Sequence, residues 1–340
     1  GAGNGTLVSN LNTSTGTLTK NGVGVWTISG GASTFTGLTT ISAGTLKLGS
    51  AGSGSNTPLG TNAGGVTVTS GAIFDLNGYT LATAEPIGSL AGSGITSTGA
   101  FINSSNNSVS YSGSIILGSG SRIVNYGSGV MTLTGNISGN FALTTVAIGD
   151  ITQSSASVWS GTGTLIKEGS GTLILAGQNT MTGAMTVSTG KLQLGASGGA
   201  TNTPLGTNAG GVTVSAGAVL DLSTFNLGGA STYETLNLTG TGIKNTGALI
   251  SSSYGSNNFG AMTVTTNARV INSGSGTITF GGTITAAASV NFGIGGTGPV
   301  TISGVYGATA TTATITKWDS GILTIGAASI TTGLVRINVG

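Results

Sequence analysis

The stretch NTPLGTNAGGVTV, residues 56–68, recurs without change at residues 202–214, a shift of 146 residues. The stretch after each copy is repeated as well, because GAIFDL at residues 71–76 corresponds to GAVLDL at residues 217–222. A period of this length must contain several smaller structural units. Such repetition is typical of solenoids, in which each coil stacks only on its neighbours.

The shift continues to RIVN at residues 122–125, which corresponds to RVIN at residues 269–272 after 147 residues. We therefore predict multi-coil repeat units of about 147 residues that begin near each of three lysines. The predicted segments are 1–19 (end of a preceding unit), 20–166 (first unit), 167–316 (second unit) and 317–340 (start of a third unit). We also expect the export signal, end caps and anchor to lie outside these residues.

Short runs inside each unit alternate apolar side chains with hydroxyl or other polar ones. Examples are TLKL at residues 45–48, TLT at residues 132–134 and TIT at residues 277–279. Alternation with a period of two, punctuated by Gly, Asn and Ser, predicts short half-buried strands. Ten or more consecutive residues with a helical period occur nowhere, so we predict an all-β chain.

Composition favours an elongated fold over a compact one. Glycine contributes 65 of 340 residues, charged residues are 5% and hydrophobic residues 37%, whereas ordinary domains have about 25% charged residues and about 7% glycine. Evenly spread Val, Ile and Leu argue against disorder, and a sandwich or barrel does not normally repeat in this way. We predict a right-handed parallel β-helix, an elongated rod with Gly and Asn at its corners and about 20–25 residues per coil.

Residues 165–180, LIKEGSGTLILAGQNT, resemble the autotransporter-associated β-strand repeat, also called the passenger-associated transport repeat. The family pattern is a Lys-x-Gly-x-Gly opener, an Asn-Thr-x-Thr-Gly turn and a Gly-Thr-Leu-x-Leu close. The resemblance continues through residues 182–194, with Met181 where the family commonly has Tyr.

A second copy covers residues 18–28 and closes at residues 44–48, with Trp26 in the place of the usual Leu and without the Asn of the turn. A shortened third copy begins at Lys317 and closes at residues 333–337. The resemblance implies a secreted or surface-exposed bacterial protein whose β-helical passenger uses the repeat in folding and export. The structural positions it implies are Lys20, Gly22, Gly24, Lys167, Gly169, Gly171, Lys317 and Gly321.

The residue inventory argues against catalysis. Histidine and cysteine are absent, which excludes Ser-His-Asp and Cys-His schemes and thiolate metal sites. Glycosidases need paired carboxylates, but the acids here lie singly along the chain: Asp75, Glu85, Asp150, Glu168, Asp221, Glu234 and Asp319. We interpret such acids as corner residues that cap backbone amides, and we expect no catalytic residue, metal ligand or cofactor.

Two other residue classes suggest binding surfaces. The aromatics Trp26, Trp159, Trp318, Tyr111, Tyr126 and Tyr254 could line a glycan-binding face, although packing is the simpler account for Trp26 and Trp318. Thr-x-Thr triplets at residues 132–134, 277–279, 283–285 and 314–316 resemble ice-binding arrays. Their spacing along the sequence, however, does not predict one triplet per coil.

The combined features predict a non-enzymatic structural or adhesive fibre protein, located extracellularly or on the outer cell surface of a bacterium. Expected partners are copies of the protein or neighbouring repeats of the same chain, with surface glycans or other cell surfaces as alternatives. Nine basic residues spread over the chain do not form a nucleic-acid surface, and no apolar run has the length of a membrane helix. The alternative function is a glycan-binding or polysaccharide-degrading β-helix of the tailspike or lyase kind, and a less favoured one is an ice-binding solenoid.

Overall fold

The structure is a computed structural model that describes residues 2–227, 234–308, 313–326 and 334–337. Its named strands pair in parallel, apart from one antiparallel hairpin of β6 (Asn56–Thr57) and β7 (Gly60–Thr61). The helical elements in the described residues are two 3₁₀ turns, η1 (Ile95–Ser97) and η2 (Ile243–Asn245). The predicted all-β parallel solenoid is therefore confirmed, while its right-handed sense and its repeat length stay predictions.

The chain forms two compact units. Unit 1 consists of residues 1–165 and 169–173, and unit 2 of residues 166–168 and 174–340. Strands β19 (Leu165–Glu168) and β20 (Thr172–Leu175) supply residues to both units. The repeat boundaries expected from the sequence remain predictions.

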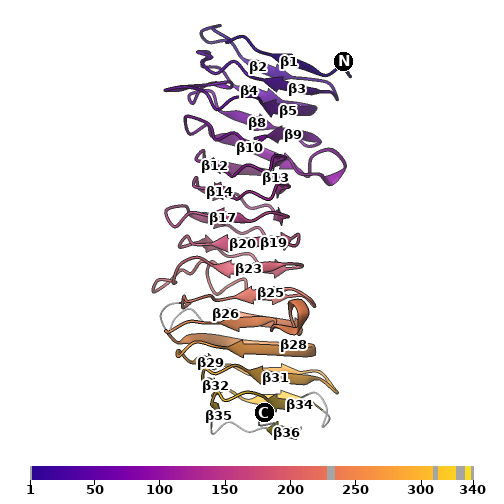
Figure 1. Cartoon of the computed structure of the whole chain (residues 1–340), viewed down its shortest axis with the longest axis vertical. Helices are drawn as coiled ribbons and strands as arrows, with labels where there is room; N and C mark the ends of the chain where they lie inside the picture. Colours follow the sequence, from indigo (N-terminus) through magenta and orange to yellow (C-terminus); the bar gives the residue numbers. More distant parts are fainter. Residues whose placement is uncertain (1, 228–233, 309–312, 327–333, 338–340) are drawn as a thin grey trace. The chain divides into compact units, whose positions relative to one another are not determined.

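In unit 1 the strands of successive coils pair in three ladders, and Figure 1 shows these strands in layers from β1 to β17. Ladder 1a contains β2 (Leu18–Lys20), β4 (Thr39–Ile41), β8 (Val66–Val68), β10 (Ile87–Gly92), the first part of β13 (Ile115–Asn125), β15 (Ile137–Ser138) and β18 (Trp159–Gly161). Ladder 1b contains β1 (Gly5–Leu7), β3 (Val25–Ile28), β5 (Gly44–Leu48), β9 (Ala72–Asp75), β11 (Phe101–Asn103), the last part of β13 and β16 (Leu143–Ala147). Ladder 1c contains β12 (Val109–Tyr111), β14 (Met131–Leu133) and β17 (Ile151–Gln153).

Unit 2 is built in the same way, beyond the short strand β21 (Thr180–Met181). Ladder 2a contains β22 (Met185–Val187), β24 (Val212–Val214), β26 (Glu234–Gly240), the middle of β28 (Asn257–Asn272), β30 (Ile284–Ala286) and β33 (Tyr306–Ala308). Ladder 2b contains β23 (Lys191–Leu194), β25 (Val219–Asp221), β27 (Leu249–Ser251), the end of β28, β31 (Asn291–Gly295), β34 (Thr314–Lys317) and β36 (Leu334–Ile337). Ladder 2c contains the start of β28, β29 (Ile278–Phe280), β32 (Val300–Ile302) and β35 (Leu323–Ile325).

Coil length varies because loops are inserted at the corners, which are the turns between ladders. Leu18 pairs with Thr39, so that coil takes 21 residues. Ile87 pairs with Ile115, a separation of 28 residues, because the loop that carries η1 lies between them. The expected range of about 20–25 residues per coil thus holds only for coils without such loops.

The core of each unit is a set of stacked apolar rows. Ile41, Val68, Leu90 and Leu117 follow one another in register on ladder 1a, and all four are buried. On ladder 1b, Phe74 stacks on Phe101 with ring centroids 5.5 Å apart. Each such buried side chain stabilises the fold by roughly 1.5–3 kcal/mol, so a narrow core suffices when every coil repeats it.

The TIT triplet of residues 277–279 is not repeated as a whole in the next coil, in line with its spacing along the sequence, but single threonines stack. Thr279, Thr301 and Thr324 occupy one outward row of ladder 2c, so threonine does recur once per coil there. The row is a single file, because the other threonine of that triplet, Thr277, has Pro299 in the corresponding place of the next coil. The sequence could not show this row, because coil lengths differ and register is set by pairing.

Buried asparagines close several corners. Asn125, the last residue of RIVN, donates from Nδ2 to the carbonyls of Gly129 at 2.6 Å and Asp150 at 2.9 Å. Its counterpart Asn272 donates to Gly276 at 2.8 Å and Pro299 at 2.7 Å. The carbonyls of Asp150 and Pro299 also accept the amides of Met131 and Ile278 from the preceding coil. Each asparagine therefore adds a second bond between neighbouring coils at its corner, which gives the repeated Asn a structural role.

Candidate functional site

Each opener forms a corner of its coil, and its backbone passes very close to the backbone of the preceding coil. A Cβ atom on Gly24 would lie 2.2 Å from the carbonyl oxygen of Gly3, and one on Gly171 would lie 2.7 Å from that of Ile148. Gly22 and Gly169 have φ angles of 81° and 83°, a left-handed conformation that side chains disfavour. The first and second openers therefore require glycine for two reasons. The backbones of neighbouring coils leave no room for a Cβ atom, and the left-handed φ angle disfavours any other residue.

The third opener shares only the close approach, because Asp319, with a φ angle of 63°, stands where the other openers have their first glycine. A Cβ atom on Gly321 would lie 2.4 Å from the carbonyl oxygen of Gly298, and the Gly321 amide donates to Gly296 at 2.9 Å. Residues 327–333, which include the start of the close at residues 333–337, lie outside the described residues.

Each opener lysine is buried and donates to corner carbonyls. Lys20 Nζ donates to Gly22 at 2.7 Å, to Ala43 at 2.9 Å and to Asn21 at 3.4 Å. Lys167 donates to Glu168 at 2.8 Å and to Thr189 at 3.1 Å, and it is fully buried.

Lys317 donates to the carbonyls of Trp318 and Asp319. Burial lowers the pKa of Lys20 and of Lys317, and the Asp319 carboxylate partly opposes this change for Lys317. The ammonium has three donors and no acceptor. Through the bonds to Ala43 and Thr189, Lys20 and Lys167 join the corner of their own coil to that of the next.

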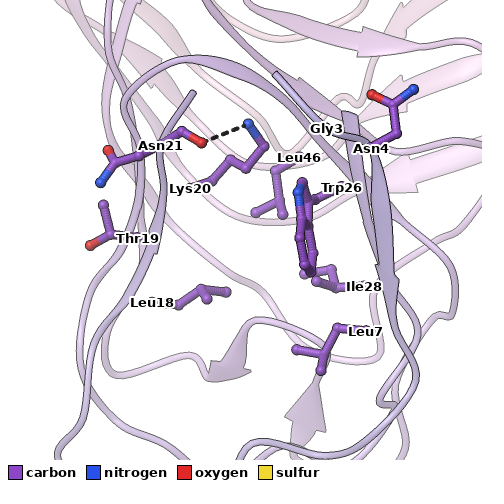
Figure 2. A pocket seen from close by; sticks show the side chains of 10 residues that line it. All are labelled: Gly3, Asn4, Leu7, Leu18, Thr19, Lys20, Asn21, Trp26, Ile28 and Leu46. Carbon is purple, nitrogen blue, oxygen red and sulfur yellow. Dashed lines mark hydrogen bonds between the residues drawn. The ribbon is translucent and has the colours of Figure 1, made fainter. Parts of the chain in front are cut away.

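An apolar pocket of about 470 Å³ adjoins Lys20 in unit 1. Figure 2 shows Trp26 standing beside Leu46, with Leu18 and Leu7 farther down and Lys20 opposite. Among the described strands, β2 pairs only with β4, so the solenoid interior is open at this level.

The second opener shows the same positions when they are covered. Leu165 and Leu173 correspond to Leu18 and Trp26, and they are 2% and 0% exposed. Trp26 itself is 42% exposed. The pocket is therefore part of the solenoid interior, and its lining residues have a core role elsewhere in the same unit.

Successive openers occupy successive corners. Six pairings along ladder 1a lead from β2 to β18, and the first opener lies at the corner between ladders 1a and 1b. Gly169 and Gly171 of the second opener instead stack on Ala147 and Ile148, at the corner that follows ladder 1b. Within unit 1, the second opener has thus advanced by six coils and one further corner.

Unit 2 shows the same advance. Lys167 caps Thr189, at the corner between ladders 2a and 2b. Lys317 ends β34 on ladder 2b, and Gly321 stacks on Gly296 and Gly298 at the next corner. A repeat therefore takes a non-integral number of coils, which the sequence period alone cannot reveal.

Asp75 and Asp221 cap backbone amides, as the sequence suggested. Asp75 Oδ1 accepts from the amide of Asn77 at 2.8 Å, and Asp221 Oδ1 from that of Ser223 at 2.7 Å. Each also pairs with a lysine on the preceding strand of its ladder: Lys47 Nζ lies 3.7 Å from Asp75, and Lys191 Nζ lies 3.1 Å from Asp221.

Glu85 and Glu234 depart from the corner-cap interpretation. Glu85 is fully buried and accepts the Thr57 hydroxyl at 2.9 Å, and burial raises its pKa to about 7. Glu234 is 1% exposed and accepts the Thr203 hydroxyl at 3.4 Å, and burial raises its pKa to about 8. Both threonines belong to the repeated NTPLG stretch, a signal that the sequence analysis did not connect with the two acids.

The aromatic residues do not gather on one face. Trp159 and Tyr111 are buried in the core of unit 1. Trp318 packs on the outside of unit 2, where the Arg269 guanidinium lies 4.8 Å from the centre of its ring. Tyr126 is 39% exposed and Tyr254 is 80% exposed.

The fold and the lysine-capped corners define the molecule as a parallel β-solenoid with internally repeated openers. Residues 18–48 and 165–194 both match the model of the passenger-associated-transport-repeat family, so the chain contains two copies of this repeat. Neither the curated proteins nor the solved structures gave a match.

Two further searches bear on chemistry. The described residues contain no group of three or more acids with the geometry of a metal site. In the same part of the chain, no helix is long and apolar enough to cross a membrane.

Proposed function

We propose that this chain is part of the passenger of a secreted or surface-exposed bacterial protein and acts there as a non-catalytic structural stalk. The observation that carries the proposal is the pair of matched transport repeats, each built into the stacked coils of a parallel solenoid. A solenoid lengthens by duplication of whole coils, because each coil needs only its neighbours for stability.

The advance of the openers supports a spacing role. Within unit 1 the second opener lies one corner beyond the first, and within unit 2 the third lies one corner beyond the second, so the openers of one unit face different directions. Adhesion through one continuous face would require the copied residues to face the same direction in every repeat. The low charge of the chain, 5%, together with the outward threonine row of ladder 2c, supports lateral association between copies as a second element of the proposal.

Surface display tests the proposal directly. The chain is placed between a secretion signal and a transporter domain in a bacterial host, and exposure is measured by protease accessibility on intact cells. We expect the chain to reach the surface, and we expect Lys20→Met with Lys167→Met to lower display more than Lys47→Met. Retention of the parent chain inside the cell, with a carrier that displays other passengers, would contradict the proposal.

A polysaccharide-depolymerisation assay tests the enzymatic alternative. Asp75 and Asp221 each stand with a single lysine, whereas glycoside hydrolysis uses two carboxyl groups about 5–9.5 Å apart. We expect no turnover. Turnover that disappears in Asp75→Asn or Asp221→Asn would replace the stalk with an enzyme.

A further inference from the structure

A groove of about 310 Å³ opens on the outer surface of unit 2, beside β25 and β27. Its rim carries Asp221, Ser223, Thr246 and Ser273, and its floor includes Ile250 and Ile271. None of these residues belongs to an opener or to the solenoid core. They form a polar rim around an apolar floor, which is the usual composition of a small-ligand site.

The corresponding place in unit 1 is filled by a tyrosine. Tyr126 directly follows the Asn of RIVN, as Ser273 follows the Asn of RVIN. Its hydroxyl donates at 2.8 Å to the carbonyl of Thr98, the counterpart of Thr246. The tyrosine therefore spans from the corner to the loop that carries η1.

The floor residues differ in exposure between the two units. Ile102 and Val124, the counterparts of Ile250 and Ile271, are 7% and 1% exposed and cluster with Val146. Ile250 and Ile271 are half-exposed.

A second replacement lies beside the floor. Val124 pairs with Val146, whereas Ile271 pairs with Gly295, which has no side chain. A Cβ atom on Gly295 would lie 2.9 Å from both Ile271 Cδ1 and Asp319 Oδ2, so these two side chains occupy the place of the valine in unit 2.

The rim carboxylate of unit 2, Asp221, accepts fewer hydrogen bonds than its counterpart Asp75 in unit 1. Asp75 accepts from the amide of Asn77, from the amide of Ser104 at 3.1 Å and from its hydroxyl at 2.7 Å. For Asp221, the described hydrogen bonds are those from the Ser223 amide and from Lys191 Nζ. A carboxylate has about four acceptor positions, so Asp221 keeps capacity for a ligand donor.

From this comparison we infer that the groove of unit 2 binds one neutral sugar residue of a glycan. Lys191 already balances the charge of Asp221, which favours an uncharged ligand. A sugar ring offers hydroxyl groups at its edge for Asp221 and the serine and threonine hydroxyls, and C–H groups on its face for the two isoleucines. The groove is shallow and its volume is at the lower end of ligand sites, so a single ring binds weakly, and several rings on one glycan or several copies of the chain would add avidity.

The test is a titration of the intact chain, with its isoleucine methyl groups labelled for NMR, against D-glucose, D-galactose, D-mannose and N-acetyl-D-glucosamine. We expect at least one of the four sugars to bind and to shift the Ile250 and Ile271 methyl signals. The variant Ser273→Tyr copies the residue that closes unit 1, so it should fold and weaken binding at least tenfold. Asp221→Asn should also weaken binding, whereas Tyr126→Ser should leave binding in unit 2 unchanged.

The other outcomes overturn the inference. The site is refuted if none of the four sugars shifts the two methyl signals, or if Ser273→Tyr binds as the parent does. Should Ser273→Tyr unfold, the methyl shifts of the parent chain decide the question alone. The stalk function does not depend on this result, because surface display is measured without any glycan.

Discussion

The two buried glutamates make the stability of this protein depend on pH in a way that glutamine substitution should remove. Glu85 and Glu234 titrate with pKa values of about 7 and about 8 in the folded chain, against 4.5 for an ordinary Glu side chain. Below pH 4.5 both states are protonated, and the buried carboxyl carries no charge penalty. As pH rises, the unfolded chain ionises first, so stability falls until the folded carboxyl ionises as well.

The magnitude follows from the size of each shift. One pKa unit corresponds to about 1.36 kcal/mol, so the shift of Glu85 costs about 3 kcal/mol and that of Glu234 about 5 kcal/mol at alkaline pH. Glu234 should cause the larger loss of unfolding free energy. Its loss should also continue to higher pH, since the folded carboxyl keeps its proton to about pH 8. Because these two sites lie in different compact units, the losses should appear in different parts of the chain.

Urea denaturation of the parent, Glu85→Gln, Glu234→Gln and the double variant between pH 4.5 and pH 9 measures the effect, with local hydrogen exchange to assign each step. The amide of glutamine carries a pH-independent cost, because Glu234 Oε2 is buried and accepts no hydrogen bond from the described residues. The informative quantity is therefore the slope of unfolding free energy against pH. Equal slopes for the parent and the double variant would refute the reasoning.

Three further substitutions test the corners, each by chemical denaturation. Lys167→Met leaves the carbonyls of Glu168 and Thr189 without their ammonium donor and should lower the free energy of unfolding by about 1–3 kcal/mol. Its control is Lys47→Met, at a half-exposed lysine, which should cost no more than about 1 kcal/mol. Equal losses in the two variants would show that the opener lysine has no special role. Gly24→Ala places a Cβ 2.2 Å from a backbone oxygen and should cost about 1–3 kcal/mol. Gly88→Ala is its control, because a Cβ there meets nothing within 4 Å, and a similar loss in both would show that crowding is not the cause. Asn272→Leu removes two hydrogen bonds to corner carbonyls and should cost about 2 kcal/mol or more; an unchanged midpoint would mean that water replaces the amide.

Local sequence patterns were sufficient to predict the class of fold. Alternation in runs such as TLKL at residues 45–48 reports which side chains point inward, because side chains alternate across a strand with a period of two. Glycine in the openers reports close backbone approach for the same local reason, as Gly24 and Gly169 show. The repeated lysine could be located from the sequence, but its carbonyl partners could not, since Lys20 reaches Ala43 on the next coil.

Tertiary structure decided everything that depends on register between coils. Coils of 21 and 28 residues in the same unit prevent the sequence period from giving the angle between successive repeats, so the advance by one corner emerged only from strand pairing. For the same reason Thr279 and Thr301 proved to be neighbours in one row. Tyr126 and Ser273 are aligned by the repeat, yet only packing shows that one fills a groove that the other leaves open. The sequence by itself therefore determined which residues face the core and the corners, and stacking determined which of them meet.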